Sequence, residues 1–292
     1  MNRALPSEVM RALGHSKLIA LQAPANAAIG ERRSRAVGAG MEFAQYKDYE
    51  PGDDMRHLDR HVYARHGKTV VKRFHLEQRL RVSVLLDASA SMAVDPGSWD
   101  RAVDVAAVFG EATLNGGDQV RFGVAKDGRV IWGEVTSRDA QLRREVSRLA
   151  RIVPDGHFAA MTELASRSLE ALDKPGMLVV ISDWLVDGFA EALRSWRVRS
   201  QEVVAVQVLG EAEAGGRGET GSLRLVDVET GEVVERQADA RTWRAYRAAV
   251  AEWSAQVRSA VWAVEGRWVS TAAHEPLDAS FVTDLRRQGL VT

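Results

Sequence analysis

Apolar residues follow two alternating patterns along the chain after residue 80. Short, mostly apolar runs occupy 80–87 (LRVSVLLD), 176–183 (GMLVVISD), 202–209 (EVVAVQVL) and 266–272 (GRWVSTA). Runs of this length, bounded by polar residues, predict strands that are buried on both faces. Elsewhere apolar residues recur every three or four positions, which predicts helices at 99–115, 138–151, 162–173, 187–200, 240–264 and 278–288.

This alternation of buried strands and helices predicts the fold class. Strands that are apolar on both faces occur in parallel sheets covered by helices, because right-handed crossover connections place a helix on each face. We therefore expect an α/β fold with a Rossmann-like, doubly wound, mainly parallel sheet over residues 80–292. Two hairpins interrupt the alternation: one turns at Lys126–Arg129, and the other is an insertion at about 210–238.

Residues 1–79 form a separate N-terminal segment in this prediction. Its first part, 6–21, predicts a helix, and the glycine- and arginine-rich stretch 30–40 (GERRSRAVGAG) predicts a mobile loop. The stretch 40–78 is dense in charged and aromatic residues, with acids placed to cap a helical turn. We interpret its charges as a structural network. A metal site at His57 and His61 and a partner-docking surface are the alternatives.

Hydroxyl and carboxylate side chains gather where two of the predicted strands end. Asp87, Ser89 and Ser91 alternate at the end of one strand, Asp183 closes another, and Thr162 begins a helix. Ligands of doubly wound sheets bind beyond the carboxyl ends of the strands, where the strand order reverses. All five side chains offer hard oxygen and none offers nitrogen or sulfur. The set therefore suits Mg²⁺, with Mn²⁺ or Ca²⁺ as alternatives, rather than zinc.

Other interpretations of this cluster stay open. Ser89 and Ser91 would serve equally to cap the turn that follows the strand. Asp87 would serve as nucleophile or metal ligand in a magnesium-dependent phosphoryl-transfer or hydrolytic enzyme. The sequence contains no G-x-x-x-x-G-K-[ST] loop and no G-x-S-x-G elbow, which argues against a P-loop NTPase and an α/β-hydrolase esterase. Trp184, beside Asp183, is either an interface aromatic or a core residue.

The oxygen cluster resembles the metal-ion-dependent adhesion site of von Willebrand factor A domains. The match consists of Asp87-x-Ser89-x-Ser91, then Thr162, then Asp183, with strands and helices in the corresponding order. The resemblance implies that Ser89 and Ser91 bind Mg²⁺ directly and that Thr162 joins in one state. Asp87 and Asp183 would act chiefly through water. It also implies an open coordination position, which a carboxylate of a partner protein fills.

A second resemblance lies in the N-terminal segment. The residues that carry it are Glu42-Phe43, Tyr49, Pro51-Gly52-Asp53-Asp54, Arg56, Leu58-Asp59 and Ala64-Arg65. They look like the hallmark of a bacterial family catalogued as domain of unknown function 58, although Arg60 stands where the family usually has tryptophan. The resemblance implies a family-specific N-terminal extension before a von Willebrand factor A-like domain. Such proteins typically accompany MoxR-type AAA+ ATPases, which implies that an ATPase of this type, or its client, is the partner.

The composition limits the classes of function. The formal net charge is −1 over 292 residues, so nucleic-acid binding is not expected as the main role, although Arg32, Arg33 and Arg35 form a basic loop. The absence of cysteine excludes disulfides, thiolate zinc sites and thiol nucleophiles. We find neither a signal-type apolar core nor an apolar stretch of membrane-spanning length, and expect a cytoplasmic protein. Taken with the two resemblances, these limits predict a non-catalytic, metal-dependent protein-binding module, which the family resemblance implies is an adaptor or assembly factor working with a MoxR-type AAA+ ATPase.

Overall fold

The computed structural model describes residues 5–21, 42–51, 53, 55, 58–75, 79–157, 160–214, 220–228 and 231–292. The chain divides into two compact units. The larger unit comprises Met1–Gln22 and Leu80–Thr292, and the smaller one comprises Ala23–Arg79. The basic loop predicted at 30–40 lies outside the described residues.

The larger unit is built on a six-stranded sheet with the order β10-β7-β6-β3-β4-β5. The strands are β3 (Arg81–Asp87), β4 (Gln119–Lys126), β5 (Arg129–Trp132), β6 (Gly176–Ser182), β7 (Gln201–Leu209) and β10 (Arg267–Ala272). Every neighbouring pair is parallel except β4 and β5, which are antiparallel. The predicted fold class is confirmed: this is a doubly wound, mainly parallel α/β sheet flanked by helices.

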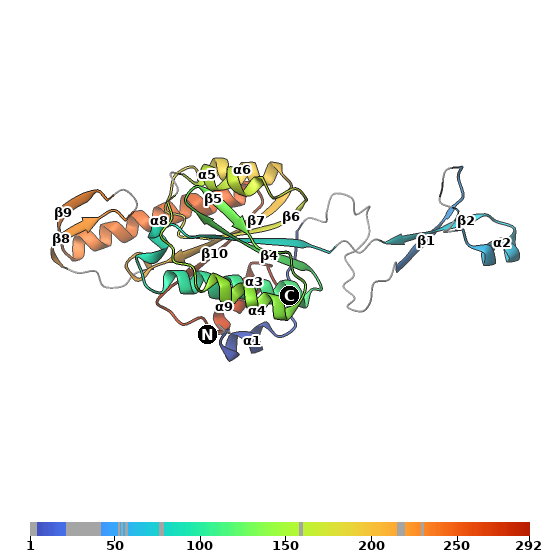
Figure 1. The fold of residues 1–292 in the computed structure, drawn as a ribbon, viewed down its shortest axis with the longest axis horizontal. Helices are drawn as coiled ribbons and strands as arrows, with labels where there is room; N and C mark the ends of the chain where they lie inside the picture. Colours follow the sequence, from blue (N-terminus) through green and yellow to red (C-terminus); the bar gives the residue numbers. More distant parts are fainter. Residues whose placement is uncertain are drawn as a thin grey trace. The chain divides into compact units, whose positions relative to one another are not determined.

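Two layers of helices cover the sheet (Figure 1). One layer contains α1 (Ser7–Leu13), α3 (Ser98–Asn115), α4 (Asp139–Leu149) and α9 (Ala279–Arg287); the other contains α5 (Met161–Leu169), α6 (Phe189–Val198) and α8 (Ala240–Ala263). Successive side chains of a strand point to opposite faces. In β3, Val84 and Leu86 accordingly join the first apolar cluster and Leu85 joins the second. Within the described residues, no helix combines the length and apolarity needed to cross a membrane.

Both predicted hairpins are present. The β4–β5 turn places Asp127 and Gly128 at φ 51° and 65°, as a two-residue turn between twisted strands requires. The insertion forms the antiparallel pair β8 (Gly221–Val226) and β9 (Val233–Ala238). A short helix, α7 (Glu211–Ala214), precedes this hairpin and was not predicted, because four residues give too short a periodic pattern.

The first helix differs from its prediction in length and in grouping. It ends at Leu13, because Gly14 follows at φ 48°, and Leu18 instead forms a β-bridge with Val291. Val9 and Leu13 are buried in the apolar cluster that also contains residues of α9. Burial of this face explains why the helix groups with Leu80–Thr292 rather than with the rest of the segment 1–79.

The smaller unit contains an antiparallel pair of strands and one short helix. These are β1 (Glu42–Asp48), β2 (Val70–His75) and α2 (Arg60–His66). Asp59 caps α2, since its carboxylate accepts hydrogen bonds from the backbone N–H groups of His61 and Val62, and also from the Tyr46 hydroxyl at 2.9 Å. Lys47 Nζ lies 3.2 Å from the Asp53 carboxylate. The alternative metal site predicted at His57 and His61 includes His57, which lies outside the described residues.

Candidate functional site

The candidate site lies at the carboxyl edge of the sheet, between β3 and β6. The chain continues from β3 to β4 on one side and later returns to β6 on the other side, so the strand order reverses at β3. The register pairs Leu86 of β3 with Ile181 of β6. The next residues, Asp87 and Ser182, therefore lie next to each other at the place where doubly wound sheets bind ligands.

Asp87 is held at the bottom of this edge by two hydrogen bonds. Its side chain is only 4% exposed. One carboxylate oxygen accepts from the Ser89 backbone N–H at 2.9 Å, and the other accepts from the Ser182 hydroxyl at 2.8 Å. The hydroxyl oxygens of Ser89 and Ser91 are themselves hydrogen-bonded at 2.9 Å. The alternating Asp-Ser-Ser pattern therefore folds into one tight turn with its oxygens together.

Asp183 completes the cluster from β6. Its carboxylate accepts hydrogen bonds from the Ser91 hydroxyl and from the Leu185 backbone N–H, the latter at 3.0 Å. Its backbone carbonyl accepts from Nε2 of Gln207, on β7, at 2.9 Å. Four of the five predicted residues, Asp87, Ser89, Ser91 and Asp183, thus belong to one hydrogen-bonded cluster.

The two carboxylates of this cluster carry poorly compensated charge. Burial raises the pKa of Asp87 to about 6, and the nearby charge of Asp183 adds to the rise, although hydrogen bonds from Ser89 and Ser182 oppose it. Burial also raises the pKa of Asp183, and the charge of Glu213 contributes to that rise. A cation between the two carboxylates would offset both the lost hydration and the repulsion.

Thr162 lies apart from these hydrogen bonds. It is exposed near the start of α5, where the Met161 N–H donates to the Asp187 carbonyl at 2.8 Å. A Cβ added to Gly188 would lie 3.1 Å from the Thr162 methyl group, so the helix start packs closely against the loop that follows Asp183. Within the described residues, Thr162 makes no hydrogen bond to the other four predicted side chains.

Two residues that the sequence analysis missed help to build the site. The Ser182 hydroxyl donates to Asp87 and accepts the Trp184 backbone N–H at 3.0 Å, so it links the ends of β3 and β6. Gly156 exchanges backbone hydrogen bonds with Ala88 and Ala90, and a Cβ there would come within 3.0 Å of the Ala88 carbonyl oxygen. Ser182 could have been found only from the register of β3 against β6. Gly156 could have been found only from the close approach of its loop to the turn after β3.

Trp184 is a core residue and not an interface aromatic. Its side chain is fully buried, and its indole N–H donates to the Val206 carbonyl at 3.1 Å. Its backbone has φ 59°, which is uncommon for a bulky residue and marks a tight turn directly after Asp183. The buried indole therefore anchors the turn that presents the Asp183 carboxylate.

The donor set fits a hard divalent cation that keeps part of its water. All the clustered side chains offer oxygen, which is the ligand atom that Mg²⁺ prefers. In the described part of the chain, no group of three or more His, Cys, Asp or Glu side chains is placed to hold a metal ion. A cation at this edge would therefore depend on the serine hydroxyls and on water for most of its shell.

A comparison with protein families supports the resemblance seen in the N-terminal motif. The family described as "Protein of unknown function DUF58" matches residues 45–256. The chain belongs to the DUF58 family. Uncharacterized protein Rv1480 of Mycobacterium tuberculosis and uncharacterized protein Mb1516 of Mycobacterium bovis are each 29% identical to this DUF58 protein over 236 residues. Each alignment covers 76% of this chain and 74% of the relative.

Solved structures also resemble this DUF58 protein. BatB from Bacteroides thetaiotaomicron has a TM-score of 0.43 at 14% identity, and an aerotolerance-related membrane protein from Bacteroides fragilis has 0.40 at 15%. Both likenesses cover 72% of this chain and 98% of the other. TRAP from Plasmodium vivax has a TM-score of 0.35 at 10% identity, covering 44% of this chain and 57% of TRAP. Scores below 0.5 do not bear on the function of this chain.

Proposed function

We propose that this DUF58 protein is a non-catalytic protein-binding module that recognises a carboxylate of its partner through a divalent cation. The observation that carries the proposal is the pair of carboxylates formed by the buried Asp87 and the partly buried Asp183, joined to Ser89 and Ser91 at the strand-order reversal. The von Willebrand factor A-like fold that the Asp87-x-Ser89-x-Ser91 motif implies is typical of protein-interaction modules. In this proposal Mg²⁺ is the ion, with Mn²⁺ or Ca²⁺ as alternatives.

Each residue of the cluster has a distinct part in this function. Ser89 and Ser91 turn their hydroxyl oxygens toward each other and would contact the ion directly. Asp87 and Asp183 supply the negative charge, from positions fixed by Ser182, Leu185 and the β-strands. Thr162, exposed at the start of α5, would join only in one state. When bound, the ion supplies an electrophilic position that an incoming carboxylate completes.

The partner that fits this proposal is a MoxR-type AAA+ ATPase or its client. The support is the family resemblance, which now extends over residues 45–256. A protein partner that offers one Asp or Glu side chain would bind with direction and only in the presence of the ion. The cytoplasmic location also stays a prediction.

The burial of Asp87 disfavours the enzymatic alternative. A nucleophilic carboxylate needs a free oxygen facing the substrate. Both oxygens of Asp87 accept hydrogen bonds, and the side chain is 4% exposed. Asp87 is therefore better placed to hold an ion at a fixed position than to attack a substrate.

Replacement of both serines tests the proposal directly. In Ser89→Ala/Ser91→Ala, Mg²⁺ affinity measured by isothermal titration calorimetry should fall at least about tenfold, since two direct oxygen ligands are lost. Association with a purified MoxR-type ATPase should require Mg²⁺ and disappear with EDTA. Ser195→Ala, which removes an exposed hydroxyl of α6, is the matched control and should change neither measurement. Association that persists in EDTA and in the double variant would refute the ion-bridged mechanism.

A further inference from the structure

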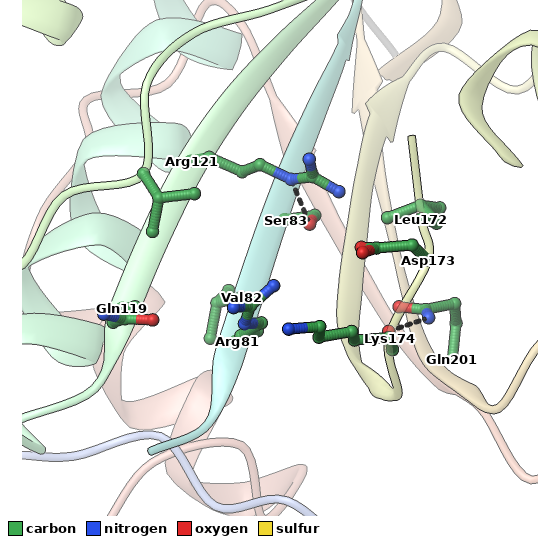
Figure 2. A pocket seen from close by; sticks show the side chains of 10 residues that line it. Arg81, Val82, Ser83, Gln119, Arg121, Leu172, Asp173, Lys174 and Gln201 are labelled. Carbon is green, nitrogen blue, oxygen red and sulfur yellow. Dashed lines mark hydrogen bonds between the residues drawn. The ribbon is translucent and has the colours of Figure 1, made fainter. Parts of the chain in front are cut away.

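A small cleft lies at the opposite edge of the same sheet, near the amino ends of β3 and β4 (Figure 2). Its polar lining includes Arg81, Ser83, Arg121, Asp173, Lys174 and Gln201. Arg81 begins β3, whereas Asp87 ends it. The cleft is therefore separate from the oxygen cluster, and an inference about it does not depend on the proposed metal site.

Arg121 is fixed in one orientation within this cleft. Its Nε donates to the Ser83 hydroxyl at 3.0 Å, and Nη2 donates to the Ala171 carbonyl at 2.8 Å. The guanidinium also lies over the Trp132 ring, 4.4 Å from its centroid. Within the described residues, Nη1 has no hydrogen-bond partner, so this nitrogen keeps its donors for a ligand. Partial burial lowers the pKa of Arg121.

The facing wall is a turn that is held equally firmly. Leu172 is buried, and Nε2 of Gln201 donates to the Lys174 carbonyl at 2.8 Å. A Cβ at Gly176 would lie 2.4 Å from the Arg81 carbonyl oxygen, so only glycine lets this turn approach β3. The Lys174 ammonium and the Asp173 carboxylate extend from the turn toward β3 (Figure 2).

The charges around the cleft do not balance. Arg81, Arg121 and Lys174 are cationic and Asp173 is anionic, so three positive charges and one negative charge leave a surplus of two. The charge of Arg81 lowers the pKa of Arg121 and that of Asp173 raises it, so both lie within electrostatic reach of Arg121. A dianion would relieve the repulsion between the two guanidinium groups.

We propose that this cleft binds a phosphoryl oxyanion, either inorganic phosphate or the phosphate of a monoester. The guanidinium of Arg121 provides oriented N–H donors, and Arg81 and Lys174 provide charge. The cleft is small, so any part of the ligand beyond the phosphoryl group stays outside it.

Titration with phosphate at constant ionic strength and in EDTA tests this inference independently of the metal site. Wild-type protein should show saturable binding of inorganic phosphate by ¹H–¹⁵N NMR, and chloride at the same ionic strength should not produce the shifts. Arg121→Gln should weaken binding by about tenfold, since charge-assisted hydrogen bonds are lost. Asp173→Asn should strengthen it by about threefold, because a like charge on an exposed side chain is removed. Methyl phosphate should bind at least as tightly if the natural ligand is a monoester, and more weakly if it is the free ion.

Further variants keep the result interpretable. Lys174→Gln changes an exposed side chain, so we expect it to leave the fold intact. It should weaken phosphate binding, and it therefore provides a second test if Arg121→Gln proves unstable. Arg129→Gln is the matched control. It removes an exposed arginine at the start of β5, which pairs with Lys126 at the carboxyl end of β4, and it should leave the affinity for phosphate unchanged. Absence of saturable binding to wild type would overturn the proposal. So would an Asp173→Asn variant that binds no more tightly than wild type.

Discussion

Without metal at pH 7.5, Asp87→Asn is expected to be more stable than wild type and to lose its stabilisation by Mg²⁺. Asp87 has a pKa of about 6 in the folded protein, against an ordinary value of 3.8. A shift of about two units corresponds to about 3 kcal/mol of unfavourable free energy once the carboxylate is ionised. The loss of a charge-assisted hydrogen bond takes back about 1–2 kcal/mol. We therefore expect a net gain of about 1–2 kcal/mol.

The pH dependence of this gain follows from the sign of the pKa shift. Well below pH 3.8 both folded and unfolded Asp87 are protonated, so the charge contributes nothing. Between pH 4 and 6 the unfolded state releases the proton while the folded state retains it, and the stability of wild type falls. Above pH 6 the loss is complete. Asp87→Asn should therefore differ most from wild type above pH 6 and least near pH 4.

Urea denaturation at pH 7.5 and near pH 4, each with EDTA or with Mg²⁺, measures these differences in the free energy of unfolding. Mg²⁺ should raise the free energy of unfolding of wild type at pH 7.5 but not that of Asp87→Asn, because a ligand stabilises only the state that binds it. Asp284→Asn, which removes an exposed carboxylate on α9, is the control: it keeps Asp87 and should show the same pH dependence and the same stabilisation by Mg²⁺ as wild type. A variant equally destabilised at both pH values would contradict the uncompensated charge, and one that Mg²⁺ still stabilises would contradict the metal cradle.

Replacement of Trp184 by alanine is expected to produce the largest loss of stability. The indole is fully buried, packs edge-to-face against Trp268 with centroids 6.3 Å apart, and donates to the Val206 carbonyl. Truncation of a buried tryptophan costs about 3–5 kcal/mol, since packing is lost and a cavity opens. Because Trp184 follows Asp183 directly, the variant should also lose Mg²⁺ affinity.

Two companion variants separate the causes of this loss. Trp184→Phe retains most of the packing but leaves the Val206 carbonyl without its donor, and should cost about 1–3 kcal/mol. Trp262→Ala removes a tryptophan that is 57% exposed on α8, and should cost less than about 1 kcal/mol. Urea midpoints measure all three. A Trp184→Ala variant no less stable than Trp262→Ala would show that the indole does not anchor the turn.

Both edges of the sheet carry charge that protein groups alone do not neutralise. The carboxyl edge holds the buried Asp87 and the partly buried Asp183, and the amino edge holds the positive surplus of Arg81, Arg121 and Lys174. The first suits a cation and the second suits an anion. Because Arg81 begins β3 and Asp87 ends it, the two sites can be tested one at a time.

Mostly apolar runs were sufficient to predict β3, β6, β7 and β10, and hence the fold class. They do so because a strand buried on both faces has few polar positions in its interior. The D-x-S-x-S spacing likewise predicted the turn after β3, since Asp87 accepts the Ser89 N–H two residues on. The helix predicted at 6–21 is present but shorter, Ser7–Leu13, because local spacing does not show that Leu18 pairs with Val291 at the far end of the chain.

The sequence by itself determined the parallel α/β sheet, its hairpins and the position of Asp87, Ser89, Ser91 and Asp183 at strand ends. Only the tertiary structure decided that Ser182 joins the two acids, that Thr162 stays outside their hydrogen bonds, and that Arg81, Arg121 and Lys174 share a cleft. The physical reason is strand register. Hydrophobic periodicity shows which face a residue occupies, but pairing between distant strands decides which side chains lie next to each other.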